Sequence, residues 1–513
     1  MTLIALHPES LPTAALALHD TASSRQIEAW ALSRHPAFTL MQRAGHAVFQ
    51  LSAALYPYAQ QVWVACGPGN NGGDGLVAAS YWQERMQHSG GQVTVSWLGQ
   101  PERCSPDTLQ ALTMAQAAGV SIQRQAPTQF DLAIDALWGL GLQRPPEGLG
   151  AAWIHNLTSC SQPVICVDLP SGLDADTGQW LPEGPAQPMG PRHTLSLLTL
   201  KPGLWTGQGR ACSGDIWLDD LETSPELAGV PPTAWLQGSQ PTTPNRAQQH
   251  LGHKGTHGDV WVLGGQLPER QAAGMVGAAW LAARAALRAG AGRVYVRTLQ
   301  SSPYATSVAP DPLYPEIMHR PDLPPGQDPL AAQATVVCGC GGGQSVAAWL
   351  PSLIRMAPRL VLDADALNAL AADSALMNTL HKRHHRGLST VLTPHPLEAA
   401  RLLNTVVAEV QHNRLEAAQT LANQTSCVVV LKGSGTVVAA PGLAPIINPT
   451  GNDLLGTAGT GDVLAGMLGA ALAQHHGLTM QAVQQLSAST VFEHGLRANR
   501  WPHPRAMVAS DVL

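Results

Sequence analysis

Four carboxylates stand beside glycine-rich turns in this sequence. Asp74 lies within Cys66–Gly75 (CGPGNNGGDG), Asp135 and Asp168 end two later apolar runs, and Asp462 ends the stretch TAGTGD. Bare backbone N–H groups at a glycine turn favour anions such as phosphate, above all where the turn opens a helix. A carboxylate beside such a turn can move a proton or hold a metal cation. These patterns predict chemistry on small molecules that carry phosphate.

One lysine stands at the start of another glycine turn. Lys432 opens KGSGT directly after the apolar run 428–431. Only four of the 29 basic residues are lysines, so lysine has not been used as general surface charge. A compact positive charge here suits the phosphates of a nucleotide. The sequence has no Walker A pattern, so we do not expect a P-loop enzyme.

A group of oxygen-bearing side chains is expected in the first half of the chain. Asn71, Asp135, Asp168 and Ser171 follow or end three apolar runs that read as parallel strands. Because the carboxyl ends of such strands converge on one crevice, we expect these residues to lie close together. Hard oxygen ligands with few nearby cations suit a metal cation beside an acid or base. Each residue alone can instead cap a turn or helix, and both readings stay open at this point.

Short apolar runs alternate with helical patterns in both halves. This alternation predicts α/β domains, each with a mostly parallel sheet that helices cover on both faces. The expected strands are 61–65, 93–98, 132–136, 164–167, 259–263, 293–297, 334–338, 360–362, 391–392 and 428–431. The helical patterns of the first half cover 25–55, 76–88 and 109–118.

Length and composition divide the chain in two. At 513 residues it is too long for one ordinary core. The segment 223–250 is rich in Pro, Gly, Ser, Thr and Gln and has no sustained apolar period, so we expect a linker there. The expected domains are therefore 1–222 and 251–513.

Charge and cysteine usage limit the function classes. A net charge of −6 without a basic block argues against nucleic acid or an anionic membrane as partner. Eight scattered cysteines without a C-x-x-C pair fit a reducing cytoplasm. No basic residue precedes the apolar stretch 11–18, and arginines interrupt 272–289, so neither a signal peptide nor a membrane span is expected. We expect a soluble cytoplasmic protein.

Five motifs of the first half resemble the NAD(P)H-hydrate epimerase domain: LMQRAG, GPGNNGGDG, DALWGLGL, VDLPSGLDADTG and LKPG. The resemblance implies a three-layer αβα, Rossmann-like domain that interconverts the R and S epimers of hydrated NADH and NADPH. We choose Asp168 as its acid or base from position and chemistry. The family usually has Phe and Thr where this chain has Trp138 and Leu140.

The same resemblance implies the ligands of the first domain. It implies potassium bound by Asn71, Asp135 and Ser171. It implies substrate contacts at Asn70, Asn71, Gly72, Gly73, Asp74, Gly139, Leu140, Gly141, Leu142, Gln143, Arg144, Pro145 and Asp168.

The second half resembles ribokinase-like kinases through its GTGD signature, which ends at Asp462. More closely, HKGTHG, DADALN, TPHPLEAARLL, LKGSGTVV, NPTGN and GTGDVLAG resemble the ADP-dependent NAD(P)H-hydrate dehydratase. This implies a three-layer αβα, ribokinase-like domain that uses ADP with magnesium to dehydrate the S epimer, releasing AMP and phosphate. Asp462 is the expected base, because it stands where phosphoryl transfer requires one.

The resemblance also implies the contacts of the second domain. Its substrate contacts are Ala278, Gly341, Gly343, His395 and Asp462, and its nucleotide contacts are Lys432, Gly433, Ser434, Gly435, Thr436 and Gly461. Two loops depart from the family pattern: 339–343 reads GCGGG instead of GPGLG, and 451–456 reads GNDLLG instead of GNPGMA.

Two rival hypotheses remain at the level of sequence. One is a ribokinase-like kinase for a vitamin or sugar, with a nucleotide-sensing first domain; it would consume ATP and release a stable phosphorylated product. The other is a binding protein whose first domain catalyses nothing. TPHP and NPTGN favour the dehydratase. The expected partners are hydrated NADH and NADPH (NADHX and NADPHX), ADP, and further copies of the chain in a homo-oligomer.

Overall fold

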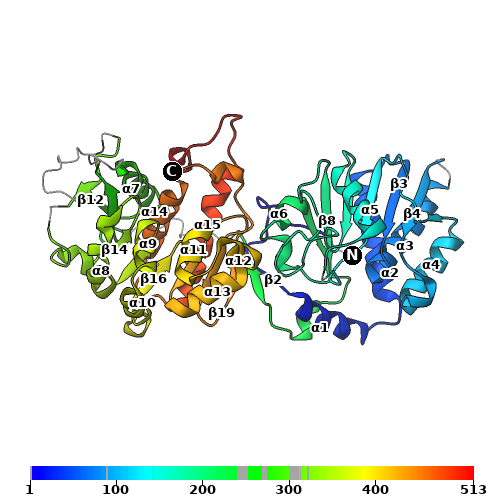
Figure 1. The fold of residues 1–513 in the computed structure, drawn as a ribbon, viewed down its shortest axis with the longest axis horizontal. Coiled ribbons are helices and arrows are strands. Elements are labelled where there is room, and N and C mark those ends of the chain that lie inside the picture. The colour runs from blue at the N-terminus through cyan, green and yellow to red at the C-terminus, as the bar shows by residue number, and fades with distance from the viewer. Residues whose placement is uncertain are drawn as a thin grey trace. The chain divides into compact units, whose positions relative to one another are not determined.

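The computed structural model describes residues 3–87, 90–142, 144–239, 252–267, 274–299, 311, 313–320 and 323–513. Two compact units make up the chain (Figure 1). The first comprises Met1–Leu11 and Leu16–Trp235, and the second comprises Pro12–Ala15 and Leu236–Leu513.

The first unit has a sheet in the order β1-β9-β8-β7-β6-β3-β4-β5. All neighbours are parallel except β1 and β9. The strands are β1 (Ile4–Ala5), β3 (Gln61–Cys66), β4 (Gln92–Trp97), β5 (Ser121–Gln123), β6 (Leu132–Ala136), β7 (Val164–Val167), β8 (Arg192–Leu197) and β9 (Asp215–Asp219). The helices are α1 (Thr21–Leu32), α2 (Thr39–Leu55), α3 (Asn70–Met86), α4 (Pro106–Ala117), α5 (Gly148–Ser159) and α6 (Gly209–Cys212), and β2 covers Leu16–Leu18.

Successive residues of β3 show why this unit has three layers. Val62 and Val64 join the core formed with α2, α3 and α4, whereas Trp63 and Ala65 join a second core formed with α5. Side chains alternate between the two faces of a strand, so a strand that is apolar throughout needs helices on both faces.

The second unit contains a sheet in which the order runs β13-β12-β11-β14-β15-β16-β17-β18-β19. Its neighbours are parallel as far as β17, and β17, β18 and β19 are antiparallel. These strands are β11 (Asp259–Gln266), β12 (Arg293–Leu299), β13 (Met318–His319), β14 (Thr335–Cys338), β15 (Arg359–Leu362), β16 (Ser389–Leu392), β17 (Val428–Leu431), β18 (Val437–Ala440) and β19 (Leu443–Ile447).

The helices of the second unit cover both faces of that sheet. Val260 and Val262 of β11 join the core with α7, α14 and α15, and Trp261 and Leu263 join the core with α8, α9, α10, α11 and α13. These helices are α7 (Val276–Arg288), α8 (Leu350–Met356), α9 (Asp365–Ala371), α10 (Ser374–His381), α11 (Pro396–Leu403), α12 (Val407–His412), α13 (Arg414–Thr425), α14 (Thr460–Ala473) and α15 (Met480–Asn499). The predicted fold class, two three-layer αβα domains, is confirmed.

Two sequence-based expectations differ from the structure. The helical pattern 25–55 forms two helices, α1 and α2, because Pro36 lies between them and Phe38 adopts a left-handed φ of 66°. The segment 223–250 is not linker throughout: Ala234–Leu236 forms strand β10, a neighbour of β2, and the N–H of Gln237 donates to the carbonyl of Ile447 at 2.9 Å. Residues 240–250 of that segment lie outside the described residues.

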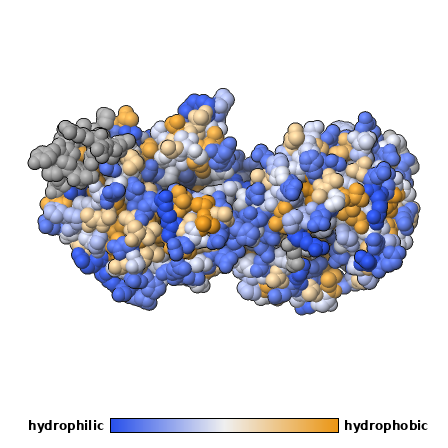
Figure 2. All heavy atoms as spheres, viewed as in Figure 1, coloured by the Kyte–Doolittle hydropathy of each residue, from blue (hydrophilic) through white to orange (hydrophobic). Residues whose placement is uncertain are grey.

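The surface drawn in Figure 2 is mainly hydrophilic, as expected when the large apolar side chains are buried in the cores. On the face drawn in Figure 2, hydrophobic residues form small groups separated by hydrophilic ones. Among the described residues, no helix combines the length and the apolar character that a membrane crossing requires.

A close helix contact in the second unit yields the first testable prediction. A Cβ on Gly466 of α14 would lie 2.0 Å from the carbonyl oxygen of Ala282 on α7. Gly466→Ala is therefore expected to destabilise the protein by about 1–3 kcal/mol, because the helices must move apart. Gly277→Ala on α7 is the control: a Cβ there meets nothing within 4 Å, so its stability should be unchanged or slightly raised. Denaturant unfolding measures both, and equal stability of the two variants would contradict the contact.

Candidate functional site

A cavity of about 320 Å³ opens where β3, β6, β7 and β8 end in the first unit. Of the residues predicted to bind the hydrate, those that line it are Asn70, Asn71, Asp74, Gly139, Leu140, Gly141 and Asp168. Gly72, Gly73, Leu142, Arg144 and Pro145 are not among its lining residues, and Gln143 lies outside the described residues. The structure therefore brings together the polar part of the predicted site.

Gly72 and Gly73 serve close packing in this structure. A Cβ on Gly72 would lie 2.1 Å from the carbonyl oxygen of Gly67, and a Cβ on Gly73 would lie 2.6 Å from the Met41 side chain. Both glycines are buried at the start of α3. Their lack of a side chain lets α3 begin close to the tip of β3.

Asp168 is fixed by a buried ion pair with Lys201. Its Oδ1 accepts from the Lys201 ammonium and, at 3.1 Å, from the N–H of Leu197. Lys201 also donates to the Leu197 carbonyl at 2.9 Å, and its side chain is only 1% exposed. Asp168 has a left-handed φ of 66°, a strained conformation that is common at functional sites. A Cβ on Gly139 would lie 3.1 Å from Asp168 Oδ2, so this second oxygen faces a residue of the cavity wall.

Lys201 and Glu28 also line the cavity, and neither was assigned a role from the sequence. The rarity of lysine drew attention to Lys432, and the same count applies to Lys201 in LKPG. Glu28 lies on α1, before the first motif of the resemblance, so no motif marked it. Burial raises the pKa of Glu28, and the nearby Asp168 raises it further.

The structure brings together two of the three expected potassium ligands. The Ser171 hydroxyl donates to Asp135 Oδ1 at 2.6 Å, and the Ser171 N–H donates to Asp135 Oδ2 at 2.9 Å. Burial raises the pKa of Asp135, and the Ser171 hydrogen bonds oppose that shift. Asn71 lines the cavity, and within the described ranges it has no direct hydrogen bond to either residue.

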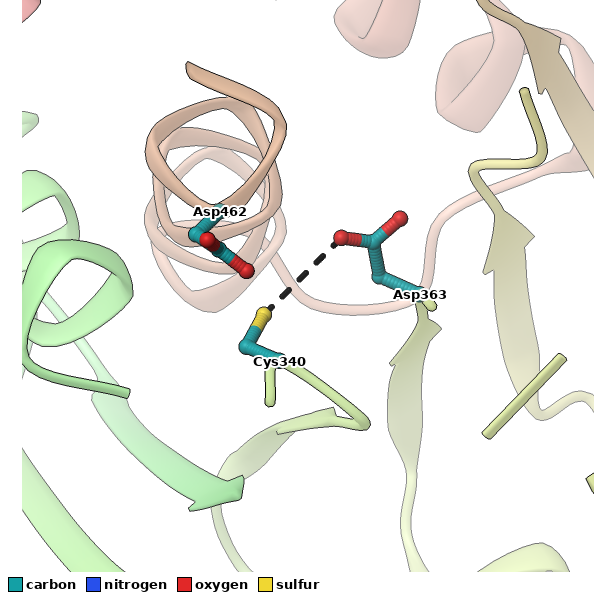
Figure 3. Close-up of side chains that lie close together, drawn as sticks. All are labelled: Cys340, Asp363 and Asp462. Carbon is teal, nitrogen blue, oxygen red and sulfur yellow. Dashed lines mark hydrogen bonds between the residues drawn. The ribbon is translucent and has the colours of Figure 1, made fainter. Parts of the chain in front are cut away.

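In the second unit, three side chains from separate elements converge (Figure 3). Cys340 follows β14, Asp363 follows β15, and Asp462 lies in the first turn of α14. Their ligand atoms all lie within 4.8 Å of one another. Figure 3 shows the Cys340 thiol between the two carboxylates, and Cys340 Sγ lies 3.9 Å from Asp363 Oδ2. The cluster therefore brings together the loop 339–343 and two motifs of the predicted dehydratase, DADALN and GTGDVLAG.

Lys432 adds a positive charge to this cluster. Asp363 Oδ1 accepts from Lys432 Nζ at 2.8 Å and from the Thr393 hydroxyl at 2.7 Å. A Cβ on Gly461 would lie 3.3 Å from Lys432 Nζ, so the ammonium stands beside the first turn of α14. Burial raises the pKa of Asp462 to about 6, and the nearby Asp363 adds to the increase. Asp462 is thus poised to exchange a proton near neutral pH.

The other predicted nucleotide contacts form the turn that joins β17 to the antiparallel β18. Gly433 and Ser434 are exposed there, Gly433 and Gly435 have positive φ values, and the Thr436 hydroxyl donates to the Gly433 carbonyl at 3.0 Å. The sequence did not indicate a role for Asp363, the first residue of the motif DADALN; in the structure it accepts a hydrogen bond from the lysine of this turn.

Besides Asp462, the predicted substrate contacts of the second unit lie in two places: where the loop 339–343 meets the start of α7, and at the start of α11. A Cβ on Gly341 would lie 2.8 Å from the Ala278 Cβ, which places these two residues side by side, and the Gly343 N–H donates to Asp365 Oδ2 at 2.8 Å. His395 caps α11: its Nδ1 accepts from two backbone N–H groups, and its Nε2 lies 3.2 Å from Glu398 Oε1. His395 therefore has a structural role, while its half-exposed ring can still meet a ligand.

Comparison with known proteins identifies the family. One family model, described as NAD(P)H-hydrate dehydratase, matches residues 260–513, and another, described as YjeF-related protein N-terminus, matches residues 37–203. The bifunctional NAD(P)H-hydrate repair enzyme Nnr of Escherichia coli (strain K12) is 37% identical over 460 residues, which cover 85% of this chain and 81% of that protein. The chain belongs to the family of bifunctional NAD(P)H-hydrate repair enzymes.

Other members of the repair-enzyme family match over most of the chain. The enzyme of Coxiella burnetii is 34% identical over 509 residues, which cover 97% of this chain and 98% of that protein. A solved ADP/ATP-dependent NAD(P)H-hydrate dehydratase from Bacillus subtilis is 28% identical over 52% of this chain and 90% of that chain, with a TM-score of 0.39. The Rossmann-like and ribokinase-like classes expected for the two domains are confirmed by the family.

The Lys201–Asp168 pair gives a stability prediction. Lys201→Met leaves the Asp168 carboxylate buried without its cation, which typically costs about 3–5 kcal/mol. The double variant Lys201→Met/Asp168→Asn should recover part of this loss, because no buried charge remains. A double-mutant cycle by denaturant unfolding measures the coupling. Additive losses in the two single variants would contradict the ion pair.

Proposed function

We propose that this chain repairs hydrated NADH and NADPH in two linked reactions. The epimerase domain, 1–222, interconverts the R and S hydrates, and the dehydratase domain, 251–513, converts the S form to NADH or NADPH with ADP, releasing AMP and phosphate. The observation that carries the proposal is the convergence of Asp462, Asp363 and Lys432 at the start of α14, in a chain of the repair-enzyme family.

In the dehydratase, Asp462 acts as the base. It takes the proton of the hydrate's hydroxyl group while that oxygen attacks the terminal phosphoryl group of ADP and AMP departs. Phosphate is a better leaving group than hydroxide, so its departure with the loss of the neighbouring ring proton restores the double bond. Lys432 and the N–H groups at the start of α14 stabilise the moving negative charge. Gly461 leaves room for the phosphate beside Lys432.

Magnesium suits the carboxylates of this cluster. Asp363 uses its Oδ1 for Lys432 and Thr393, and its Oδ2 has only the long contact of 3.9 Å with the Cys340 thiol among the described residues, so Oδ2 would be the oxygen that holds a cation carried by ADP. Mg²⁺ is commonly bound by one or two carboxylates together with substrate phosphates. When bound, it supplies neutralising charge on the phosphates, and the Cys340 thiol is a poor ligand for such a hard ion.

In the epimerase, Asp168 exchanges a proton with the hydrate's hydroxyl group at the stereogenic ring carbon. Lys201 and the Leu197 N–H keep Asp168 Oδ1 in place, and Oδ2 is the oxygen on the side of Gly139. Potassium would be held by the Asp135 carboxylate, the Ser171 hydroxyl and the Asn71 amide oxygen. The adjacent Asp135 and Ser171 oxygens fit a hard cation, whose charge would stabilise the buried carboxylate.

We further propose a cytoplasmic homo-oligomer. All eight cysteines are free, which fits a reducing compartment. The mass of the purified chain in solution tests the oligomeric state, and a monomeric mass would end that part of the proposal.

The two-step function is tested with a mixture of hydrate epimers. Wild-type protein with ADP should restore the dihydronicotinamide absorbance of the whole pool. Asp168→Ala should restore the S half at the wild-type rate and the rest only as fast as the epimers interconvert without enzyme. Asp462→Asn should lower the dehydration rate by at least about 100-fold. A stable phosphorylated product, or a requirement for ATP, would instead indicate a small-molecule kinase.

The pKa of Asp462 predicts the pH dependence of dehydration. The base must be ionised, so the rate should be full above pH 7 and fall as the pH drops through about 6. Burial of Asp462 is the main reason why the rate falls near pH 6, since with an exposed aspartate as the base the rate would fall near pH 4. The pH profile of kcat at saturating ADP measures it. A profile that stays flat down to pH 5 would contradict the assignment.

A further inference from the structure

Asp74 lines the same cavity as Asp168. In the epimerase reaction described above, Asp74 takes no part in proton transfer. It lies on α3 one helical turn after Asn71, so both residues point to the same side of the helix. In the part of the chain that the structure describes, its carboxyl group has no hydrogen bond or ion pair with another side chain. Its acidic group is therefore available to a molecule in the cavity.

Four carboxyl groups line this cavity, those of Glu28, Asp74, Asp107 and Asp168, and the charges around Asp168, Glu28 and Asp74 differ. Asp168 is paired with Lys201. Glu28 is shielded in part by the positive charges of Lys201 and Arg25. For Asp74, burial raises the pKa well above its usual range, and the charges of Asp168 and Glu28 raise it further. Of Asp168, Glu28 and Asp74, only Asp74 has no positive charge among the influences on its carboxyl group in the described part of the chain.

Two carboxyl groups in one cavity, one paired with a lysine and the other without such a partner, can divide the acid and base roles between two side chains. We propose that Asp74 is a second catalytic residue of the epimerase, the acid that protonates the departing hydroxyl group of the hydrate while Asp168 acts as the base. This inference rests on the proposed epimerase function and assigns the proton donor within it.

The reaction balances with these two groups. Asp74 gives its proton to the hydroxyl oxygen, the bond between carbon and oxygen breaks, and water leaves as the ring nitrogen lone pair forms a carbon–nitrogen double bond. A water molecule then adds to the opposite face of that carbon, the nitrogen recovers its electron pair, and Asp168 takes the proton that the water loses. The carbon is inverted, one proton has passed from Asp74 to Asp168, and exchange with solvent restores the starting state. The reverse reaction exchanges the two roles.

A neighbouring amide group also points to a ligand in this cavity. The Asn71 Nδ2 atom is buried and has no hydrogen-bond acceptor in the described ranges. Buried amide groups in folded proteins are almost always hydrogen-bonded. Asn71 is therefore placed to donate to an oxygen of the hydrate beside Asp74.

The test follows conversion of the purified R hydrate of NADH to the S hydrate by chromatography, in the full-length chain and without ADP. Asp74→Asn should lower kcat at least about 100-fold while KM changes less than threefold. Asp74→Glu keeps a carboxyl group and should be at least tenfold faster than Asp74→Asn. Glu28→Gln should stay within tenfold of wild type. Asp215→Asn, which removes an exposed carboxylate of β9, should match wild type.

Each variant also needs a check on its fold. Dehydration of the S hydrate with ADP should proceed at the wild-type rate in all of them, and thermal unfolding should show both units intact.

In ¹⁸O-labelled water, each wild-type turnover should place one solvent oxygen on the inverted carbon.

The outcomes separate this inference from the function on which it rests. A kcat for Asp74→Asn within threefold of wild type overturns it, as does a loss seen only in KM. A loss in Glu28→Gln without one in Asp74→Asn also overturns it, by assigning the acid to Glu28. Retention of the original oxygen overturns the departure of the hydroxyl group. A wild-type chain that does not accelerate epimerisation overturns the epimerase function itself.

Discussion

Burial of charge at the carboxyl ends of parallel strands is the constraint on which both sites depend. A carboxylate in such a position loses water and has to find a cation, backbone N–H groups or a proton. Asp168 has Lys201 and the Leu197 N–H, and Asp363 has Lys432 and the Thr393 hydroxyl. Asp74 has no such partner in the described residues, and Asp462 has the Cys340 thiol and the more distant charge of Lys432; burial raises the pKa of both carboxyl groups.

The two units thus reach a similar arrangement from different sheets. In each, one carboxylate is held by a lysine while a second keeps a high proton affinity a short distance away. Two of the four lysines of the chain serve these pairs, although 25 of the 29 basic residues are arginines. The compact ammonium group of lysine fits beside a strand tip where a planar guanidinium group needs more room.

Much of the fold could be predicted because the strands of a covered sheet are continuous apolar runs. The run at 132–136 and the run at 428–431 coincide with β6 and β17. The polar edge strand β5 and the hairpin strands β18 and β19 were missed, since their patterns are short or follow a glycine turn. The break at Pro36 was also missed, because the apolar spacing continues on both sides of it.

The sites were predictable only in part, even where a motif marks them. Asp168 and Asp462 were found because each stands beside a glycine turn, and the family is confirmed by the comparisons. Lys201, Asp363 and Glu28 come from segments that are distant in sequence from the carboxylates they approach. Sequence order does not reveal such contacts, since the parallel sheet places the strand ends before Lys201 and Asp363 side by side with others, and helix α1 brings Glu28 to the same cavity.

The contact between Gly466 and Ala282 has a consequence for how the second unit can respond to its substrates. It joins α14, which carries Asp462, to α7, which carries Ala278, without an intervening side chain. Because the two helices are in close contact there, we expect α14 and α7 to move together, so that the spacing between Asp462 and Ala278 changes little when a ligand binds. The turn after β17, which carries Lys432, is not part of this helix contact, so its backbone can change position on nucleotide binding without separating α14 from α7.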